Sequence, residues 1–183
     1  MTTAVLKMAV HPVDQPIPEP VKTLFMASFP PEERRNWTLQ KELVEKGRLR
    51  LLLLSREEQF AGFIFYWPLT HFDFIEYFAV EPAMRGGGTG SQVMTLLMAS
   101  GKHIVLEVEP PHNEDAIRRI RFYERLGFVA FPYIYKQPPY PPYQDPLDMW
   151  LMQKGMPQEE HTFHQISTEI YKEVYGMVWP YPA

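Results

Sequence analysis

Three apolar segments follow one another in the first half of the chain, and each has the length and residue types of a β-strand. A short polar turn separates residues 48–55 from residues 59–68, and this spacing predicts a β-hairpin. Residues 72–80 are apolar except for Asp73 and Glu76, which is typical of a strand covered on both faces. A carboxylate at position 76 of such a strand requires a polar partner or a chemical role.

Segments with helical periodicity alternate with further strands in the rest of the chain. Helices are predicted at residues 89–100 and 113–128, the second with Asn113 as its capping residue and Gly127 at its exit. The order of elements predicts an α+β fold, with a central mixed, mostly antiparallel sheet flanked by helices. The remaining predicted elements are helices at residues 19–29, 32–47 and 157–176 and strands at residues 103–109, 128–136 and 147–154.

Length, charge and cysteine content exclude several classes of function. The 183 residues suit one domain with a single core, and the net charge of −4 lacks the basic character that nucleic-acid binding requires. The chain has no cysteine, which excludes disulfides, thiolate metal ligands and an enzyme thioester.

His161 and His164 stand near Glu160 at helical spacing, but no further cluster of strong metal ligands accompanies them in the sequence. We therefore expect a solvated helix face there, no metal and no nucleic-acid partner.

The N-terminal residues lack a basic segment followed by a long apolar stretch, and no later apolar run approaches the length of a membrane span. These patterns predict a cytoplasmic protein without a membrane partner.

A cluster of glycines between residues 85 and 91 carries the strongest chemical signal. Glycine in ordered structure marks either a turn with positive φ or the close approach of another group. One interpretation is a flexible surface turn, and the other is a helix start whose free amides bind phosphate. Gly90 is followed by Ser91 and Gln92, so the P-loop pattern fails. The dinucleotide pattern fits less well, because Ser91 occupies its third glycine position.

Two spaced motifs resemble the GNAT superfamily of acyl-CoA-dependent N-acyltransferases. The segment "RGGGTG" matches the family's loop motif at Arg85, Gly88 and Gly90, and it follows "VEP" at residues 80–82. The segment "FYERLGF" at residues 122–128 resembles the second conserved block of the family. The resemblance spans roughly residues 48–136 and implies acetyl-CoA as co-substrate and an amine as acceptor. It predicts a GNAT-like domain at residues 1–155 and a C-terminal helical extension at residues 156–183.

The resemblance also implies how the cofactor is bound. The helix after Gly90 would direct its amides and its positive dipole end at the pyrophosphate, with Arg85 as the nearby cation. Backbone groups at the end of the preceding strand would pair with the pantetheine arm. The expected cofactor-binding residues are Phe78, Ala79, Val80, Arg85, Gly86, Gly87, Gly88, Thr89, Gly90 and Ser91.

Two residues are candidates for the chemistry. By resemblance, Tyr123 occupies the position that often serves in this family as general acid to the CoA sulfur, although its spacing alone would favour a core tyrosine. Glu76 is the candidate base, because strand alternation places it on the same face as Phe78 and Val80. Its alternative is a structural carboxylate that pairs with an arginine or with backbone amides.

The sequence gives weaker signals for the acceptor site than for the cofactor site. By resemblance, Arg34 and Trp37 would line an acceptor wall between the first two helices; the alternative is that these residues only cap a helix. The resemblance also implies that the proline-rich loop with Tyr135 and Tyr140 closes over the acceptor, so that these tyrosines would line an amine pocket. The predicted function is N-acetyl transfer to a small-molecule amine. The alternatives are a nonenzymatic acyl-CoA sensor or interaction module and, less well supported, a dinucleotide enzyme.

The C-terminal helix leaves the oligomeric state open. Its apolar stripe runs from Phe163 to Val174, so it needs a covering surface. Packing on its own domain is favoured, and the alternative is a homodimer interface.

Overall fold

The protein is described by a computed structural model that covers residues 5–180. Contacts divide the chain into two compact units, one of Met1–Pro68 and Ile75–Ser100 and the other of Leu69–Phe74 and Gly101–Ala183. Between residues 5 and 180, no helix is both long and apolar enough to cross a membrane.

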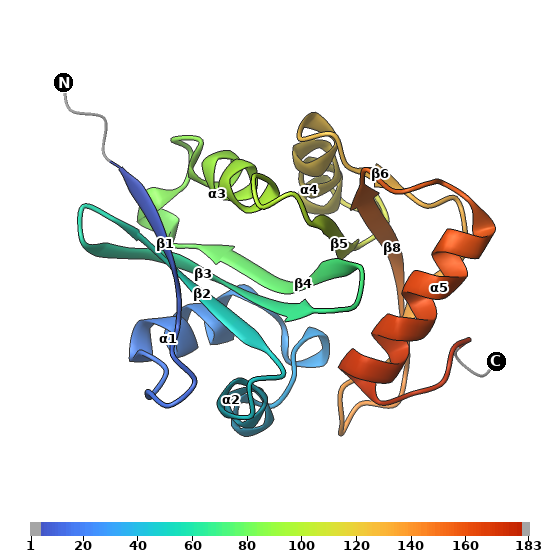
Figure 1. Ribbon diagram of the computed structural model, residues 1–183, viewed down its shortest axis with the longest axis horizontal. Coiled ribbons are helices and arrows are strands. Elements are labelled where there is room, and N and C mark those ends of the chain that lie inside the picture. The colour runs from blue at the N-terminus through green and yellow to red at the C-terminus, as the bar shows by residue number, and fades with distance from the viewer. Residues whose placement is uncertain (1–4, 181–183) are drawn as a thin grey trace. The chain divides into compact units, whose positions relative to one another are not determined.

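The first unit is built on strands in the order β1-β2-β3-β4 (Figure 1). The pairs β1–β2 and β2–β3 are antiparallel, and the predicted hairpin is confirmed by the pairing of Arg56 with Gln59. Glu57 and Glu58 form its turn with φ values of 50° and 61°. Two successive positive φ angles suit the right-handed twist of the two strands that they connect. The strands are β1 (Leu6–Val10), β2 (Arg50–Arg56), β3 (Gln59–Pro68) and β4 (Phe72–Val80).

Gly62 allows β3 and β4 to approach closely near the end of β4. A Cβ at this position would lie 2.2 Å from the carbonyl oxygen of Ala79, and the φ of Gly62 is 151°. Both observations require glycine, because a side chain would collide with the backbone of the neighbouring strand. The path of β4 toward the glycine loop is therefore fixed by backbone contact.

Three helices cover the sheet of the first unit. Figure 1 shows α1 (Glu19–Ser28) and α2 (Trp37–Glu45) on one side of this sheet and α3 (Thr89–Met98) on the other. Phe25 of α1 is fully buried, and its ring lies 4.9 Å from that of Tyr77 on β4. Aromatic side chains thus form the core between α1 and the sheet.

The predicted helix at residues 32–47 was too long at its N-terminal end. Pro31–Glu33 forms a single 3₁₀ turn, residues 34–36 are extended, and α2 begins at Trp37. The side chain of Asn36 caps α2 by accepting a hydrogen bond from the amide of Thr38 at 2.9 Å. The extended stretch carries Arg35, whose contacts are described below.

The second unit is organised around β8 (Leu147–Lys154). This strand pairs antiparallel with β5 (His103–Val108) and also with β6 (Val129–Ala130) and β7 (Tyr135–Gln137). The predicted strand at residues 128–136 is therefore broken in two, and Pro132 lies in the interruption, where it cannot donate a ladder hydrogen bond. In both units, the elements match the predicted α+β class.

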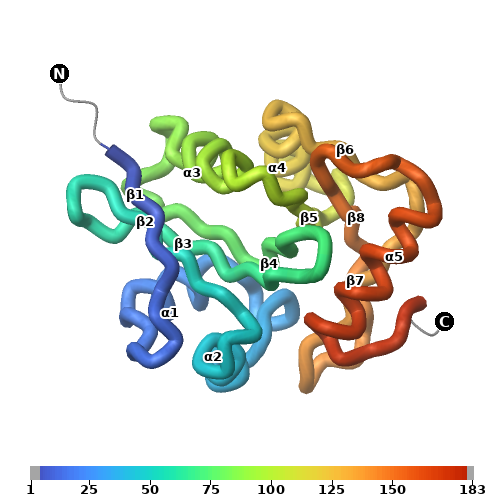
Figure 2. Tube along the Cα trace, in the orientation of Figure 1, coloured from blue at the N-terminus to red at the C-terminus, as the bar shows by residue number. Residues whose placement is uncertain are grey.

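Two helices complete the second unit, namely α4 (Glu114–Arg125) and α5 (Glu160–Ile170). The last turn, Tyr171–Tyr175, is a π-helix that ends at Gly176 with a φ of 65°. Figure 2 shows α5 beside β7. The apolar stripe of α5 is buried there, and the ring of Phe163 lies 5.5 Å from Phe131 and 5.1 Å from Tyr133. The stripe thus packs within its own unit, and a homodimer stays a prediction.

We expect Ile170→Val to lower the free energy of unfolding by about 1 kcal/mol, because it removes one methylene from a fully packed site. Ile170 has no exposed surface. Urea unfolding at two protein concentrations measures the effect, with Val178→Ala as control at a position that is 83% exposed. A midpoint that rose with protein concentration would instead place the stripe at an interface between copies.

Candidate active site

The loop between β4 and α3 has a backbone that only glycine adopts without strain. Gly86 and Gly88 have φ values of 82° and 75°, and Gly88 is the capping residue of α3. A Cβ placed on either glycine would meet no atom within 4 Å. The loop therefore borders open space. Glycine is needed at these two positions because of the positive φ, and not because neighbouring atoms of the described chain leave no room for a side chain.

The amides of this loop are available to a ligand. In the part of the chain that the structure describes, no backbone carbonyl accepts a hydrogen bond from the amides of residues 86–91. The hydroxyl of Thr89 donates to the carbonyl of Met84 at 2.8 Å and so closes the loop on itself. Several N–H groups and the positive end of the α3 dipole thus gather at one place, an arrangement that binds anions.

The end of β4 is held by Arg85. Its Nε donates to the carbonyl oxygen of Val80 at 2.9 Å, while Phe78 and Val80 are partly exposed and Ala79 is buried. The resemblance assigned the backbone of Val80 to the cofactor and Arg85 to its phosphates. Because a carbonyl oxygen has two lone pairs, the contact with Arg85 leaves Val80 able to accept a second hydrogen bond.

A second arginine beside the loop was missed from the sequence. Arg56, at the end of β2, donates from Nη2 to Oε1 of Gln92 on α3 at 2.6 Å. Its Nη1 lies 3.9 Å from the position that a Cβ on Gly87 would occupy. No local pattern could have indicated this contact, because it joins residues that are 36 positions apart.

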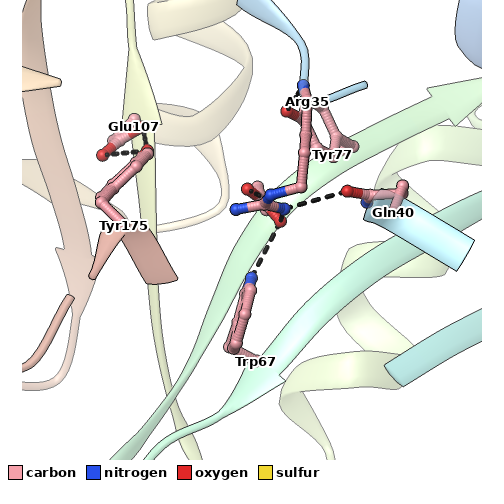
Figure 3. Close-up of polar contacts among 7 residues, drawn as sticks. Arg35, Gln40, Trp67, Tyr77, Glu107 and Tyr175 are labelled. Atoms are coloured by element: carbon pink, nitrogen blue, oxygen red, sulfur yellow. Dashed lines mark hydrogen bonds and ion pairs between the residues drawn. The ribbon is translucent and has the colours of Figure 1, made fainter. Parts of the chain in front are cut away.

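Glu76 lies in a buried polar network within the first unit, and Figure 3 shows Arg35, Gln40 and Trp67 converging. Nη1 of Arg35 lies 2.8 Å from Oε1 of Glu76, and Nε1 of Trp67 donates to Oε2 at 2.8 Å. Arg35 also donates to Oε1 of Gln40 at 2.9 Å. The side chains of Arg35 and Glu76 are only 8% and 1% exposed.

This geometry favours the structural alternative for Glu76 over the base. Both carboxylate oxygens contact Arg35 or Trp67, so the carboxylate serves as the counter-charge of a buried guanidinium. The backbone amide of Arg35 also donates to the hydroxyl of Tyr77 at 3.0 Å. The network therefore anchors the segment before α2 to β4.

The two residues of the predicted acceptor wall, Arg34 and Trp37, make mainly structural contacts with α1. Arg34 donates from Nη1 to the carbonyls of Met26 and Phe29, so it caps the C-terminal end of α1, as the alternative stated. Trp37 packs its ring 5.5 Å from that of Phe25. Neither contact shows an acceptor site, and a role of these residues in binding the acceptor stays a prediction.

Tyr123 lies on α4 in the second unit and is 7% exposed. Its ring packs 5.6 Å from that of Phe128. Burial raises the pKa of Tyr123 to about 12, and the charge of Arg119 opposes this shift. The phenol consequently stays protonated at neutral pH, as a general acid must before it acts.

The second unit contains another carboxylate that the sequence did not single out as a catalytic candidate. Glu107 of β5 accepts a hydrogen bond from the hydroxyl of Tyr135 at 2.5 Å. It also accepts one from the hydroxyl of Tyr175 at 2.9 Å (Figure 3). Burial and the charge of Glu107 raise the pKa of Tyr135 well above its usual value. Tyr140 is buried, and its ring lies 5.7 Å from that of Tyr175. The π-helical turn brings Tyr175 into this cluster.

The histidines of α5 line an open groove of about 870 Å³ within the second unit, together with His71 and His103. His164 accepts a hydrogen bond from Nε1 of Trp179 at 3.0 Å and lies 3.6 Å from Glu160. Residues 5–180 contain no group of three histidine or acidic side chains that could hold a metal ion.

Comparison with known proteins connects the glycine loop to a family. Residues 19–128 match the acetyltransferase (GNAT) family. Among curated proteins, YjbC of Bacillus subtilis (strain 168) is 29% identical over 102 residues, which are 55% of this chain and 52% of YjbC. The match therefore spans about half the length of that relative.

Solved structures share the fold. A GNAT-family protein from Bacteroides thetaiotaomicron is 37% identical, with a TM-score of 0.82 over 87% of this chain and 92% of its own. A GNAT acetyltransferase from Elizabethkingia anophelis with bound acetyl-CoA is 18% identical, with a TM-score of 0.59 over 82% and 98% of the two chains. A Bacillus subtilis acetyltransferase in complex with CoA is 14% identical, with a TM-score of 0.58 over 84% and 100%. The predicted GNAT-like α+β fold is confirmed, and the chain belongs to the GNAT family of acetyltransferases.

Proposed function

We propose that the protein transfers the acetyl group of acetyl-CoA directly to a primary amine of a small molecule. The observation that carries the proposal is the glycine loop, whose amides have no backbone acceptor among the described residues and stand at the start of α3. The structures from E. anophelis and B. subtilis, which contain acetyl-CoA and CoA, support a cofactor of this class.

In the proposal, the amides of residues 86–91 bind the pyrophosphate, and Arg85 adds a positive charge next to the loop. Backbone groups of Phe78 and Val80 pair with the pantetheine arm. Recognition by backbone groups explains how a chain with a net charge of −4 can bind a multiply charged anion.

Acetyl-CoA supplies a thioester whose carbonyl carbon is open to attack. The neutral amine forms the new C–N bond, the C–S bond breaks, and the thiolate takes a proton from the Tyr123 phenol. The amine nitrogen releases one proton, which a base or water accepts, so charge and protons balance. Tyr123 then regains a proton from solvent, because a phenol with a pKa of about 12 is a strong base once ionised.

Glu76 has two candidate roles in this scheme. As a base, it would accept the proton that the amine loses. As a positioning residue, it would hold Arg35 and thereby the segment before α2. The contacts with Arg35 and Trp67 support the second role, and the pH dependence described in the Discussion separates the two.

Release of free CoA from acetyl-CoA across a panel of small amines tests the proposed reaction. We expect acceptor-dependent thiol release with at least one class of amine. A protein that binds acetyl-CoA but never releases thiol above the background rate would be a binding module without transferase activity.

Gly88→Val should abolish the stabilisation that acetyl-CoA confers on the wild type. At a hundred times its dissociation constant, the ligand adds about 2.7 kcal/mol of apparent stability. The valine places branched carbons where phosphate oxygens approach, and the φ of 75° adds strain of roughly 1–2 kcal/mol. Thermal unfolding with and without acetyl-CoA measures the loss.

Gly47→Val is the matched control. Gly47 has a φ of 67°, and its Cβ would also meet no atom within 4 Å, but it follows α2. The control should show similar strain and keep the full ligand shift. A folded Gly88→Val protein with an intact shift would contradict the phosphate cradle.

A further inference from the structure

A cavity of about 740 Å³ lies within the second unit, where the edge of the sheet is interrupted between β6 and β7. Residues 131–134 form one wall of it, and residues 148–150 of β8 form another. Its apolar lining includes Phe131, Ile134 and Trp150. The volume and the lining are typical of a site for a small organic molecule.

Trp150 has binding capacity that the described chain does not use. It is half-buried, and between residues 5 and 180 its indole N–H has no hydrogen-bond acceptor and its ring stacks on no other aromatic ring. Ile134, which also lines the cavity, is 84% exposed although it is a large aliphatic side chain. A ligand ring in the cavity would cover apolar surface that now faces water.

Two opposite charges line the same cavity. Lys136 of β7 and Asp148 of β8 are paired in register, and Nζ lies 2.9 Å from Oδ1. Among the described residues of the lining, these two carry the only charges. Strand alternation places Asp148 and Trp150 on the same side of β8, about 6.6 Å apart along the strand. The ion pair therefore stands next to the apolar surface of Trp150.

This ion pair keeps capacity for a ligand. The side chains of Lys136 and Asp148 are 44% and 73% exposed, and exposed ion pairs contribute little to the stability of a fold. An ammonium group has three donors, and a carboxylate has about four acceptor positions. Each group can therefore bind a second partner without releasing the first.

We propose that this cavity binds a free α-amino acid with an aromatic side chain, with its ammonium on Asp148, its carboxylate on Lys136 and its ring against Trp150. The four charges then alternate in sign, so each lies next to charges of the opposite sign. A simple amine would bring its charge near Lys136 without compensation, and a simple acid would do so near Asp148. The arrangement therefore favours a zwitterion. This binding site goes beyond the proposed acetyl transfer, and its test needs no acetyl-CoA.

Titration of the full-length protein with L-phenylalanine, followed by NMR of the indole N–H groups, tests binding and location together. The chain has four tryptophans, and Trp150→Phe identifies the signal of Trp150 by its loss. We expect this signal to shift and saturate with ligand while the other three indole signals stay in place.

Three analogues test the chemistry of recognition. Removal of either ligand charge should weaken binding about fivefold, the upper end for a solvent-exposed ion pair. The analogue 3-phenylpropionate lacks the ammonium, and phenethylamine lacks the carboxylate. Glycine has both charges but no ring, so it should bind about thirtyfold more weakly than L-phenylalanine.

Two variants assign the charges. Asp148→Asn should weaken L-phenylalanine about fivefold and should not weaken 3-phenylpropionate, which has no ammonium to lose. Lys136→Met should weaken L-phenylalanine by a similar factor and should not weaken phenethylamine. Asp115→Asn is the matched control, because it removes an exposed carboxylate from another ion pair, on α4. It should leave the affinity for all four ligands unchanged.

Three results would overturn the inference. L-phenylalanine could leave the Trp150 signal in place up to its solubility limit, or shift only another indole signal. Phenethylamine or 3-phenylpropionate could bind as tightly as L-phenylalanine, so that the ion pair selects no zwitterion. The Trp150 signal could also shift with protein concentration alone, which would show that a second copy covers the cavity. None of these results bears on the proposed acetyl transfer, which thiol release tests separately.

Discussion

Tyr123→Phe should lower kcat by about 10²–10⁴-fold and leave the affinity for acetyl-CoA nearly unchanged. A phenol that protonates the leaving thiolate acts mainly in the transition state, so its removal costs little ground-state binding. Because the pKa of Tyr123 is about 12, the wild-type phenol keeps its proton from pH 7 to pH 10, and its ionisation should not limit the rate there. Steady-state thiol release and calorimetric titration measure the two quantities.

Tyr171→Phe is the control for loss of a buried hydroxyl. Tyr171 is fully buried, and its hydroxyl donates to the carbonyl of Lys136. This variant should lose about 1 kcal/mol of stability and keep its kcat. If Tyr123→Phe turned over acceptor at the wild-type rate, Tyr123 would be a core tyrosine, as its spacing alone suggested.

Arg35→Ala should destabilise the protein by about 3–5 kcal/mol, because it leaves the Glu76 carboxylate buried without its partner. The side chain of Glu76 is 1% exposed, so the guanidinium is its counter-charge in a site with little access to solvent. Urea unfolding gives the free energy. Arg34→Ala is the matched control, since within residues 5–180 the hydrogen bonds of this neighbouring arginine go to carbonyls at the end of α1, and it should cost about 1 kcal/mol. Equal losses of unfolding free energy for the two variants would show that the buried Arg35–Glu76 ion pair stabilises the protein no more than the hydrogen bonds of Arg34 do.

Glu76→Gln distinguishes the two roles of Glu76, measured at a temperature where the variant remains folded. A base is most needed at low pH, where the acceptor amine is protonated, so loss of a base would give a deficit that narrows toward the pKa of the amine. Loss of a positioning residue would lower the rate by a factor that does not depend on pH. The contacts with Arg35 lead us to expect the second profile.

The strands and the glycine loop were predictable because their signals are local. The hairpin, β4 and the start of α3 follow from apolar runs, a two-residue turn and a glycine cluster. Family resemblance then gave the cofactor class, which no pattern of periodicity could supply. The start of α2 was misplaced, because a helical pattern continued through Arg34 and Arg35 while the cap was Asn36.

The side-chain networks were not predictable, because they join distant segments. Arg35 meets Glu76 across 41 positions, and Tyr175 meets Glu107 across 68. A sequence shows that a buried carboxylate needs a partner, but it does not identify the partner. The π-helical turn at Tyr171–Tyr175 likewise has no distinct residue pattern, although it decides where Tyr175 points.

The backbone construction of the glycine loop has a consequence for how this protein can evolve. No substitution deletes an amide N–H except one to proline, so most residues of the loop can vary without removing a donor. Gly86 and Gly88 are different, because every replacement incurs the strain of a positive φ. Under the proposed function, substitutions at these two sites would therefore impair phosphate binding in one large step and not in small ones. Gradual adjustment of the proposed cofactor affinity would then fall to side chains that neighbour the loop, where mutations act in smaller steps.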